Sequence, residues 1–191
     1  MIAYMSSSNS VNDYEKSSIV NSSGITNNER SHIANAAVIF DTKYGNTEKT
    51  AKSLETGLKH SNIMTVCINA EYVTTDLLTK CDLVCIGAPT HFLSASKSMK
   101  KFLSKLKGID LSGKYGFAFD TKFDSCMSGS AAKFIEKELR KLGLQIIASR
   151  ESAIVFGMKE KEGGARLKEG EEARFEQIGL RLGARKIQNY Q

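Results

Sequence analysis

The chain has 191 residues, which suits one domain with a tail, and its 41% hydrophobic and 25% charged residues are ordinary for a soluble globular protein. No apolar stretch is long enough for a membrane span and the N-terminus lacks the apolar region of a secretory signal, so we expect a cytoplasmic protein without membrane insertion. The formal net charge is +6, but lysines alternate with glutamates in the predicted helices and no basic stripe carries interleaved aromatic residues, so we expect no nucleic-acid partner.

Serine and asparagine dominate residues 1–35, which contain few apolar residues and no periodic pattern. A segment of this composition cannot bury enough apolar surface to offset the entropy lost on ordering. We therefore predict a disordered tail over 1–35 and a folded domain over 36–191.

Five short, largely apolar runs then follow, several of them rich in valine and isoleucine, as is typical of strands buried on both faces of a parallel sheet. The expected strands are 36–40, Ile63–Ile68, Leu83–Ile86, Tyr115–Phe119 and Leu144–Ala148. A further apolar run, Ala153–Phe156, either extends the last strand or forms a short return.

Between these runs, apolar residues recur at the spacing of amphipathic helices. The stripes cover Ala51–Leu58, Met99–Leu106, Ala131–Leu142 and, in a last helix of roughly 169–187, Phe175–Leu182. Ser96 is a candidate N-cap and Gly143 a candidate C′ residue. Residues 69–82 indicate only a short helix, and 157–168 reads as an exposed loop, mobile at Gly163-Gly164.

Alternating strands and helices predict right-handed βαβ units in a three-layer α/β sandwich, with helices on both faces of the sheet. Five parallel strands in the order 2-1-3-4-5 fit this pattern. In that order a ligand lies at the carboxyl ends of strands 1 and 3, where the winding reverses. The loops after strands 1, 3 and 4 should therefore meet at one edge.

The loop after the first strand, DTKYGNT at 41–47, predicts a phosphate site. Thr42, Tyr44 and Thr47 offer hydroxyl groups, and Gly45 lets the backbone approach an oxyanion closely. Asn46 and Thr47 start the helix, where backbone N–H groups are free and the dipole favours an anion. The alternative is a plain N-cap turn, and the spacing of a Walker loop is absent.

The loop after the third strand, GAPTHFLSAS at 87–96, predicts a site for a planar ring. Pro89 stiffens the turn, His91 and Phe92 could flank a ring, and the small residues leave room for backbone hydrogen bonds. The alternative is a surface histidine beside a core phenylalanine.

The loop after the fourth strand, 120–128, begins with a repeat: FDTK occurs at 40–43 and again at 119–122. The repeat is too short to exclude chance. It nonetheless puts hydroxyl groups and lysines at the ends of two strands on the same edge of the sheet, and Phe123 is a candidate second wall for the ring.

The four cysteines show no CxxC spacing and no nearby histidine, so we expect no metal site. Cys67, Cys81 and Cys85 lie in or beside apolar runs and read as small buried hydrophobic residues. Cys126 lies in a polar loop, where its thiol could be accessible and reactive.

Over 36–190 the chain resembles the flavodoxin family, and within it the short archaeal-type members and the related quinone reductases. Residues 42–47 resemble the [TS]-x-[TY]-G-N-T loop that binds the phosphate of FMN. Residues 87–92 resemble the G-x-P-T-[RHY]-F segment that lines the isoalloxazine ring in the quinone-reductase branch. The segments 113–122 and 171–179 also look like the family.

The resemblance implies a flavodoxin-like fold, an FMN-binding domain over 36–191, and FMN as cofactor, with no catalytic dyad or triad needed. The implied contacts are Thr42, Tyr44, Gly45, Asn46, Thr47 and the Lys43 backbone at the phosphate, Pro89, Thr90, His91 and Phe92 at the ring, and Thr121, Lys122 and Ser128 at the ribityl chain or ring edge. Unlike well-known electron-carrier flavodoxins, this chain is basic and has no Trp, so His91, Phe92 or Phe123 takes the place of the stacking residue.

Three functions follow from this resemblance. The first is an FMN protein that carries electrons between intracellular redox partner proteins. The second is an enzyme, an FMN-dependent NAD(P)H:quinone oxidoreductase, and the third is a flavin-free flavodoxin-like interaction module. We expect a monomer or a small homo-oligomer.

Overall fold

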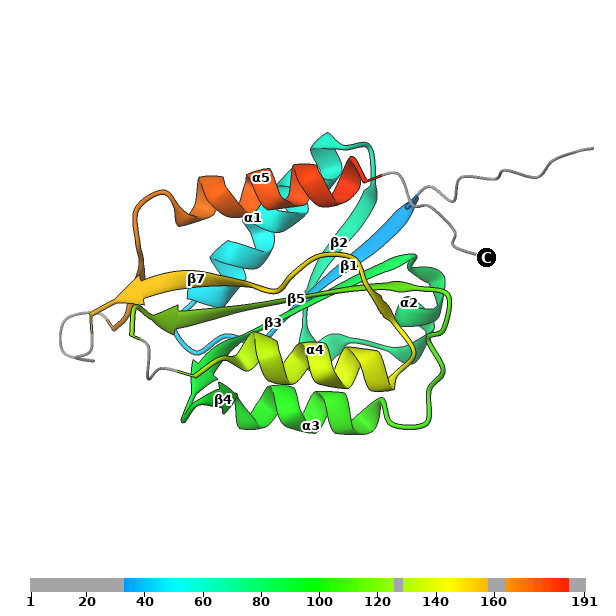
Figure 1. Ribbon diagram of the computed structural model, residues 1–191, viewed down its shortest axis with the longest axis horizontal. Helices are drawn as coiled ribbons and strands as arrows, with labels where there is room; N and C mark the ends of the chain where they lie inside the picture. The colour runs from blue at the N-terminus through cyan, green and yellow to red at the C-terminus, as the bar shows by residue number, and fades with distance from the viewer. Residues whose placement is uncertain (1–32, 126–128, 158–163, 186–191) are drawn as a thin grey trace, which may run out of the picture.

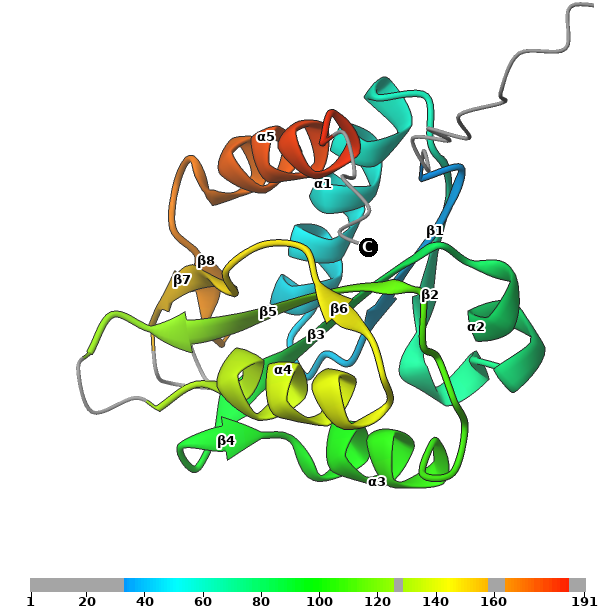
Figure 2. The same ribbon diagram turned by 45° about the vertical axis from the view of Figure 1, so that its right-hand side comes forward.

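A central sheet separates two layers of helices (Figure 1; Figure 2). The computed structural model describes residues 33–125, 129–157 and 164–185. The strands are β1 Asn35–Phe40, β2 Met64–Asn69, β3 Leu83–His91, β4 Ser94–Ala95, β5 Tyr115–Phe123, β6 Gln145–Ile146, β7 Glu151–Phe156 and β8 Arg166–Leu167. The helices are α1 Asn46–His60, α2 Thr75–Lys80, α3 Lys97–Lys105, α4 Ala131–Lys141 and α5 Glu171–Gly183, with a 3₁₀ turn, η1, at Ala70–Tyr72.

The strands lie in the order β2-β1-β3-β5-β7-β8. The first five run parallel, which confirms the predicted order 2-1-3-4-5, and β8 adds an antiparallel strand beside β7. Two short strands lie off this path, β4 antiparallel to β3 and β6 parallel to β5. The winding reverses between β1 and β3, so their carboxyl ends open a crevice there.

The prediction for the last strand was wrong in its position. Of the expected strand Leu144–Ala148, only Gln145–Ile146 pairs with the start of β5. The run Ala153–Phe156, expected as an extension or a short return, instead belongs to β7, the fifth long strand, which pairs with the second half of β5. Leu144 and Ile147 are buried, so their apolar character serves the core without a long ladder.

Two of the expected loops begin as strand. The ladder between β3 and β5 continues past Ile86 as far as Pro89 opposite Thr121, so the PTH and DTKF segments are extended backbone rather than loop. The stretch 69–82 holds η1 and α2, and β8 lies inside the predicted loop 157–168.

Some predictions fall outside the described residues: most of the tail, Cys126, Ser128 and Gly163. The division into a tail and a domain therefore stays a prediction. The described fold already includes Ile33, which is buried, and β1 begins at Asn35, one residue before the expected start.

Alternation along the strands divides the core into two layers. Ala37 and Ile39 of β1 pack with the layer that holds α3 and α4, whereas Val38 and Phe40 pack with the layer that holds α1 and α5. Successive side chains of a strand point to opposite faces, so one short apolar run serves both layers. Ser96 caps α3, its hydroxyl accepting from the Met99 N–H at 3.2 Å, and Gly143 follows α4 with a φ of 88°, both as predicted.

Two glycines bring α1 and α5 unusually close together. A Cβ atom added to Gly57 would overlap the Glu176 carbonyl oxygen and lie 2.8 Å from the Leu180 nitrogen, both backbone atoms of α5. A Cβ atom on Gly179 would lie 2.9 Å from the Gly57 Cα. The two helix backbones therefore touch where neither residue has a side chain.

We expect Gly57→Ala to lower the free energy of unfolding by about 1–3 kcal/mol, because the new methyl group meets backbone that cannot move aside. Helix propensity alone predicts the opposite sign, a gain of roughly 1 kcal/mol. Denaturant unfolding measures the difference. The matched control is Thr56→Ala, one residue away on the exposed face of α1, which should change stability by less than about 0.5 kcal/mol. A Gly57→Ala protein as stable as the parent would show that the helices do not touch.

The described cysteines are shielded from solvent to different degrees, and their thiols are harder to ionise than a free thiol. Cys81 and Cys85 are buried and Cys67 is partly buried, and burial raises the pKa of all three thiols, that of Cys67 to about 12. In a Cys126→Ser variant, which removes the fourth cysteine, we expect negligible labelling by a thiolate-specific reagent at pH 8 until denaturant is added. Rapid labelling of the folded variant would contradict this.

Candidate functional site

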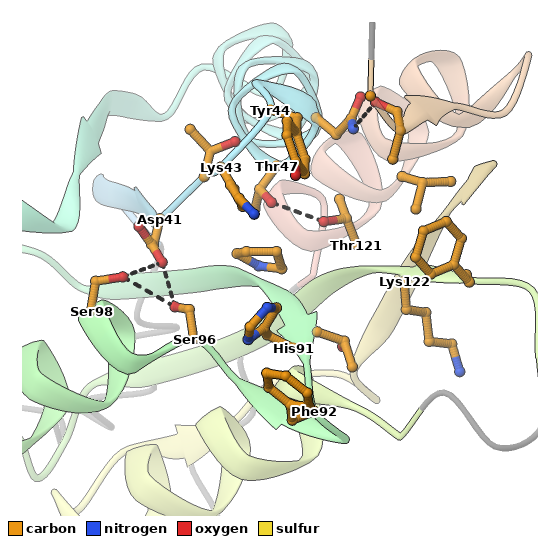
Figure 3. A pocket seen from close by; sticks show the side chains of 18 of the residues that line it. Asp41, Lys43, Tyr44, Thr47, His91, Phe92, Ser96, Ser98, Thr121 and Lys122 are labelled. Atoms are coloured by element: carbon orange, nitrogen blue, oxygen red, sulfur yellow. Dashed lines mark hydrogen bonds between the residues drawn. The ribbon is translucent and has the colours of Figure 1, made fainter. Parts of the chain in front are cut away.

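A pocket of about 640 Å³ opens at the carboxyl ends of β1, β3 and β5 (Figure 3). This volume is typical of a small-molecule site. Every predicted contact residue lines it except Gly45 and Ser128, the latter lying outside the described residues. The predicted residues in the lining are Thr42, Lys43, Tyr44, Asn46, Thr47, Pro89, Thr90, His91, Phe92, Thr121 and Lys122.

One end of the pocket is built by the turn between β1 and α1. Gly45 is the N-cap residue of α1 in a left-handed conformation, with a φ of 79°, which favours glycine over other residues. Because glycine brings no capping side chain, the N–H groups of the first turn are left to a ligand or to water. The Thr42 hydroxyl oxygen is buried and has no hydrogen-bond partner among the described residues. An oxyanion here would satisfy both sets of donors.

Neighbouring contacts hold this turn in place. The Thr47 hydroxyl lies 2.9 Å from that of Thr121, and both side chains are buried (Figure 3). Asn46 donates from Nδ2 to the Ala165 carbonyl oxygen at 2.6 Å. Ala165 directly precedes β8, so this bond joins the residue before β8 to the start of α1. The Lys43 ammonium lies 4.9 Å from the centre of the Tyr44 ring. The site is thus fixed from β5 and from the segment before β8.

The other end of the pocket is aromatic and open. His91 ends β3, and Phe92 follows it with 90% of its surface exposed, the two rings meeting edge to face at 4.4 Å (Figure 3). Phe123, at the end of β5, also lines the pocket and is exposed. Exposed aromatic faces beside a crevice suit a planar apolar ring better than they suit water.

Sequence reasoning did not name one polar cluster in this lining. The Asp41 carboxylate accepts hydrogen bonds from the hydroxyl of Ser96 and, at 2.6 Å, from that of Ser98, which ties the end of β1 to the start of α3 (Figure 3). For Ser96 the sequence predicts only a helix cap. The position of Asp41 in the FDTK repeat was the available signal.

The lining also includes five further residues that were not predicted, namely Lys97 at the start of α3, and Val155, Gly157, Gly164 and Ala165. The last four lie on or after β7, the strand whose position the sequence did not predict correctly.

Within the described ranges no three His, Cys, Asp or Glu side chains form a metal-ligand cluster. No helix in those ranges is long and apolar enough to cross a membrane. The pocket therefore offers hydroxyl and N–H donors at one end and aromatic walls at the other.

Known proteins resemble this chain in sequence and in fold. A flavodoxin from Clostridium saccharobutylicum is 34% identical over 86 residues, which are 44% of this chain and 54% of that protein, so the match spans about half of the relative's length. An archaeal flavodoxin structure superposes with a TM-score of 0.64 at 20% identity, covering 78% of this chain and 96% of that one. Flavodoxin 1 of Bacillus cereus superposes with a TM-score of 0.65 at 18% identity, covering 78% and 97%.

These structural likenesses concern the fold alone. The family is shown by sequence, because the model of the flavodoxin domain matches residues 37–141, more than half of the chain. The protein therefore belongs to the flavodoxin family.

Proposed function

We propose that the protein binds FMN in this pocket and carries electrons between redox partner proteins. FMN is the cofactor of the flavodoxin family. The observation that carries the proposal for this chain is the buried Thr42 hydroxyl without a partner, beside an uncapped helix start and across the pocket from exposed aromatic rings. A phosphate at one end and a planar ring at the other match that arrangement.

Each end of the pocket has its own task in this proposal. Thr42, the N–H groups that open α1 and the Thr47–Thr121 pair hold the phosphate, where backbone dipoles stabilise its charge. His91 and Phe92 cover the ring and exclude water from it. When bound, FMN supplies the electron chemistry, and the protein sets its orientation and surroundings.

A quinone reductase remains the second candidate, because Lys43, Lys97 and Lys122 all line the pocket and would favour an anionic substrate such as NAD(P)H. In either case the partners are redox molecules, and the oligomeric state and the cytoplasmic location stay predictions. A substitution of Thr42 distinguishes the two flavin proposals from a flavin-free module, because it tests whether the unpartnered hydroxyl binds FMN.

We expect Thr42→Val to leave the melting temperature of the apoprotein unchanged or higher, because the hydroxyl it removes has no partner. The same change should weaken FMN binding about tenfold or more, since a hydrogen bond to a charged group is worth roughly 1.5–3 kcal/mol. Isothermal titration of apoprotein with FMN measures the loss. The matched control is Thr56→Val on the exposed face of α1, which should keep wild-type affinity. Unchanged affinity in Thr42→Val would remove this residue from the site.

Thr47→Ala should also weaken FMN binding, but at a cost to the apoprotein, because Thr47 has a partner in Thr121. The two threonines thus differ in the sign of their effect on apoprotein stability. If both variants lower stability and leave affinity unchanged, the turn is a helix cap and nothing more.

Two measurements decide between the candidate functions. Flavin bands in the absorption spectrum of the purified protein, or a rise in melting temperature on adding FMN, are expected for both flavin proposals, and neither would occur in a flavin-free module. Steady-state oxidation of NADPH with a quinone acceptor should be negligible for an electron carrier. Sustained turnover would contradict the electron-carrier proposal and support the quinone reductase.

A further inference from the structure

A second unusual polar group lies on the other face of β5. Asp120, near the carboxyl end of β5, is a completely buried carboxylic acid. One of its oxygens, Oδ1, has no hydrogen-bond partner in the described part of the chain. A buried carboxyl group is costly unless its contacts compensate, so its neighbours indicate what it does.

The other oxygen, Oδ2, accepts three hydrogen bonds from two separate segments. The Thr90 hydroxyl donates to it at 3.0 Å, the Ser130 hydroxyl at 2.8 Å and the Ala132 N–H at 2.9 Å. Thr90 in turn accepts a bond from the Ala131 N–H at 2.9 Å. Asp120 thereby joins the end of β3 to the first turn of α4, where the helix dipole favours a negative charge.

The segment held in this way is strained. Phe92 and Leu93 lie between β3 and β4 with φ values of 47° and 66°, a conformation that bulky side chains rarely adopt. Gly129, just before α4, lies so close to Leu93 that a Cβ atom would overlap its backbone. Left-handed residues of this kind persist only where surrounding contacts impose them.

We propose that Asp120 is a positioning residue that clamps the β3–β4 hairpin onto α4 and so fixes the aromatic wall of the FMN ring site. This inference rests on the proposed function for its ligand. The clamp itself does not depend on FMN and can be tested in the apoprotein. Asp120 does not line the pocket, and acts through Thr90, which does.

The experiment compares Asp120→Ala, which removes the acceptor, with Asp120→Asn, which keeps one oxygen for the same donors. In the apoprotein we expect Asp120→Ala to speed amide hydrogen exchange at least tenfold in the hairpin around Phe92 and in the first turn of α4, with α1 unchanged. Asp120→Asn should restore most of the protection. Asp110→Asn is the matched control, since Asp110 accepts from Ser112 at 2.6 Å on an exposed turn away from the pocket.

Flavin binding then tests the ring wall. Riboflavin has the ring of FMN but no phosphate, so its affinity reports the ring end and the ratio of the two affinities reports the phosphate end. We expect Asp120→Ala to weaken riboflavin and FMN by the same factor, about tenfold, and to alter the visible circular dichroism of bound FMN. Thr42→Val, in contrast, should weaken FMN only.

Gly129→Ala provides a second route if Asp120→Ala does not fold. Its methyl group pushes against Leu93 while leaving Asp120 intact, so it should produce the same loss of hairpin protection and the same equal loss for both flavins. Unchanged exchange in the hairpin of a folded Asp120→Ala protein would overturn the clamp. If the exchange result holds and neither flavin binds the parent protein, the clamp stands and the FMN proposal fails.

Discussion

The pocket depends on the alternation of side chains at the ends of β1 and β5. Because neighbouring residues of a strand point to opposite faces, an Asp-Thr pair at a strand end serves both helical layers. Thr121 contacts Thr47 of α1, whereas Asp120 contacts the start of α4. The same pair recurs after β1, where Thr42 lies in the pocket and Asp41 accepts from Ser98 in α3.

The FDTK repeat therefore has a structural meaning. At each occurrence the phenylalanine packs in the core layer of α1 and α5, and the aspartate ties the opposite layer to the strand end by accepting bonds at a helix start. A carboxylate near a helix N-terminus is stabilised by the dipole, so the two aspartates fix α3 and α4, the helices of one layer, at the edge of the sheet where the pocket opens. The lysines that follow place positive charge in the pocket lining.

The strand order, and the part of the pocket lining that comes from the ends of β1, β3 and β5, could be predicted from the sequence, because buried parallel strands have continuous apolar runs and because topology forces their carboxyl ends together. The position of the last strand could not, since Leu144–Ala148 and Ala153–Phe156 are both largely apolar and the pairing with β5 separates them. The contacts of Asp41 and Asp120 could not be predicted from the sequence either. They join residues between 10 and 57 positions apart, whose side chains show no pattern until the sheet is assembled.

The glycine contact between α1 and α5 has a consequence for how a ligand is received. With Gly57 against the backbone of α5, α1 cannot slide or rotate along its neighbour, so the N–H groups at its start are preorganised. The β3–β4 hairpin instead meets backbone at Gly129, just before α4, and its Thr90 is held by hydrogen bonds to Asp120 and to the start of α4. In the proposed FMN complex the start of α1 would therefore receive the phosphate without rearrangement, whereas the hairpin would hold the ring only as firmly as the contacts of Asp120 allow.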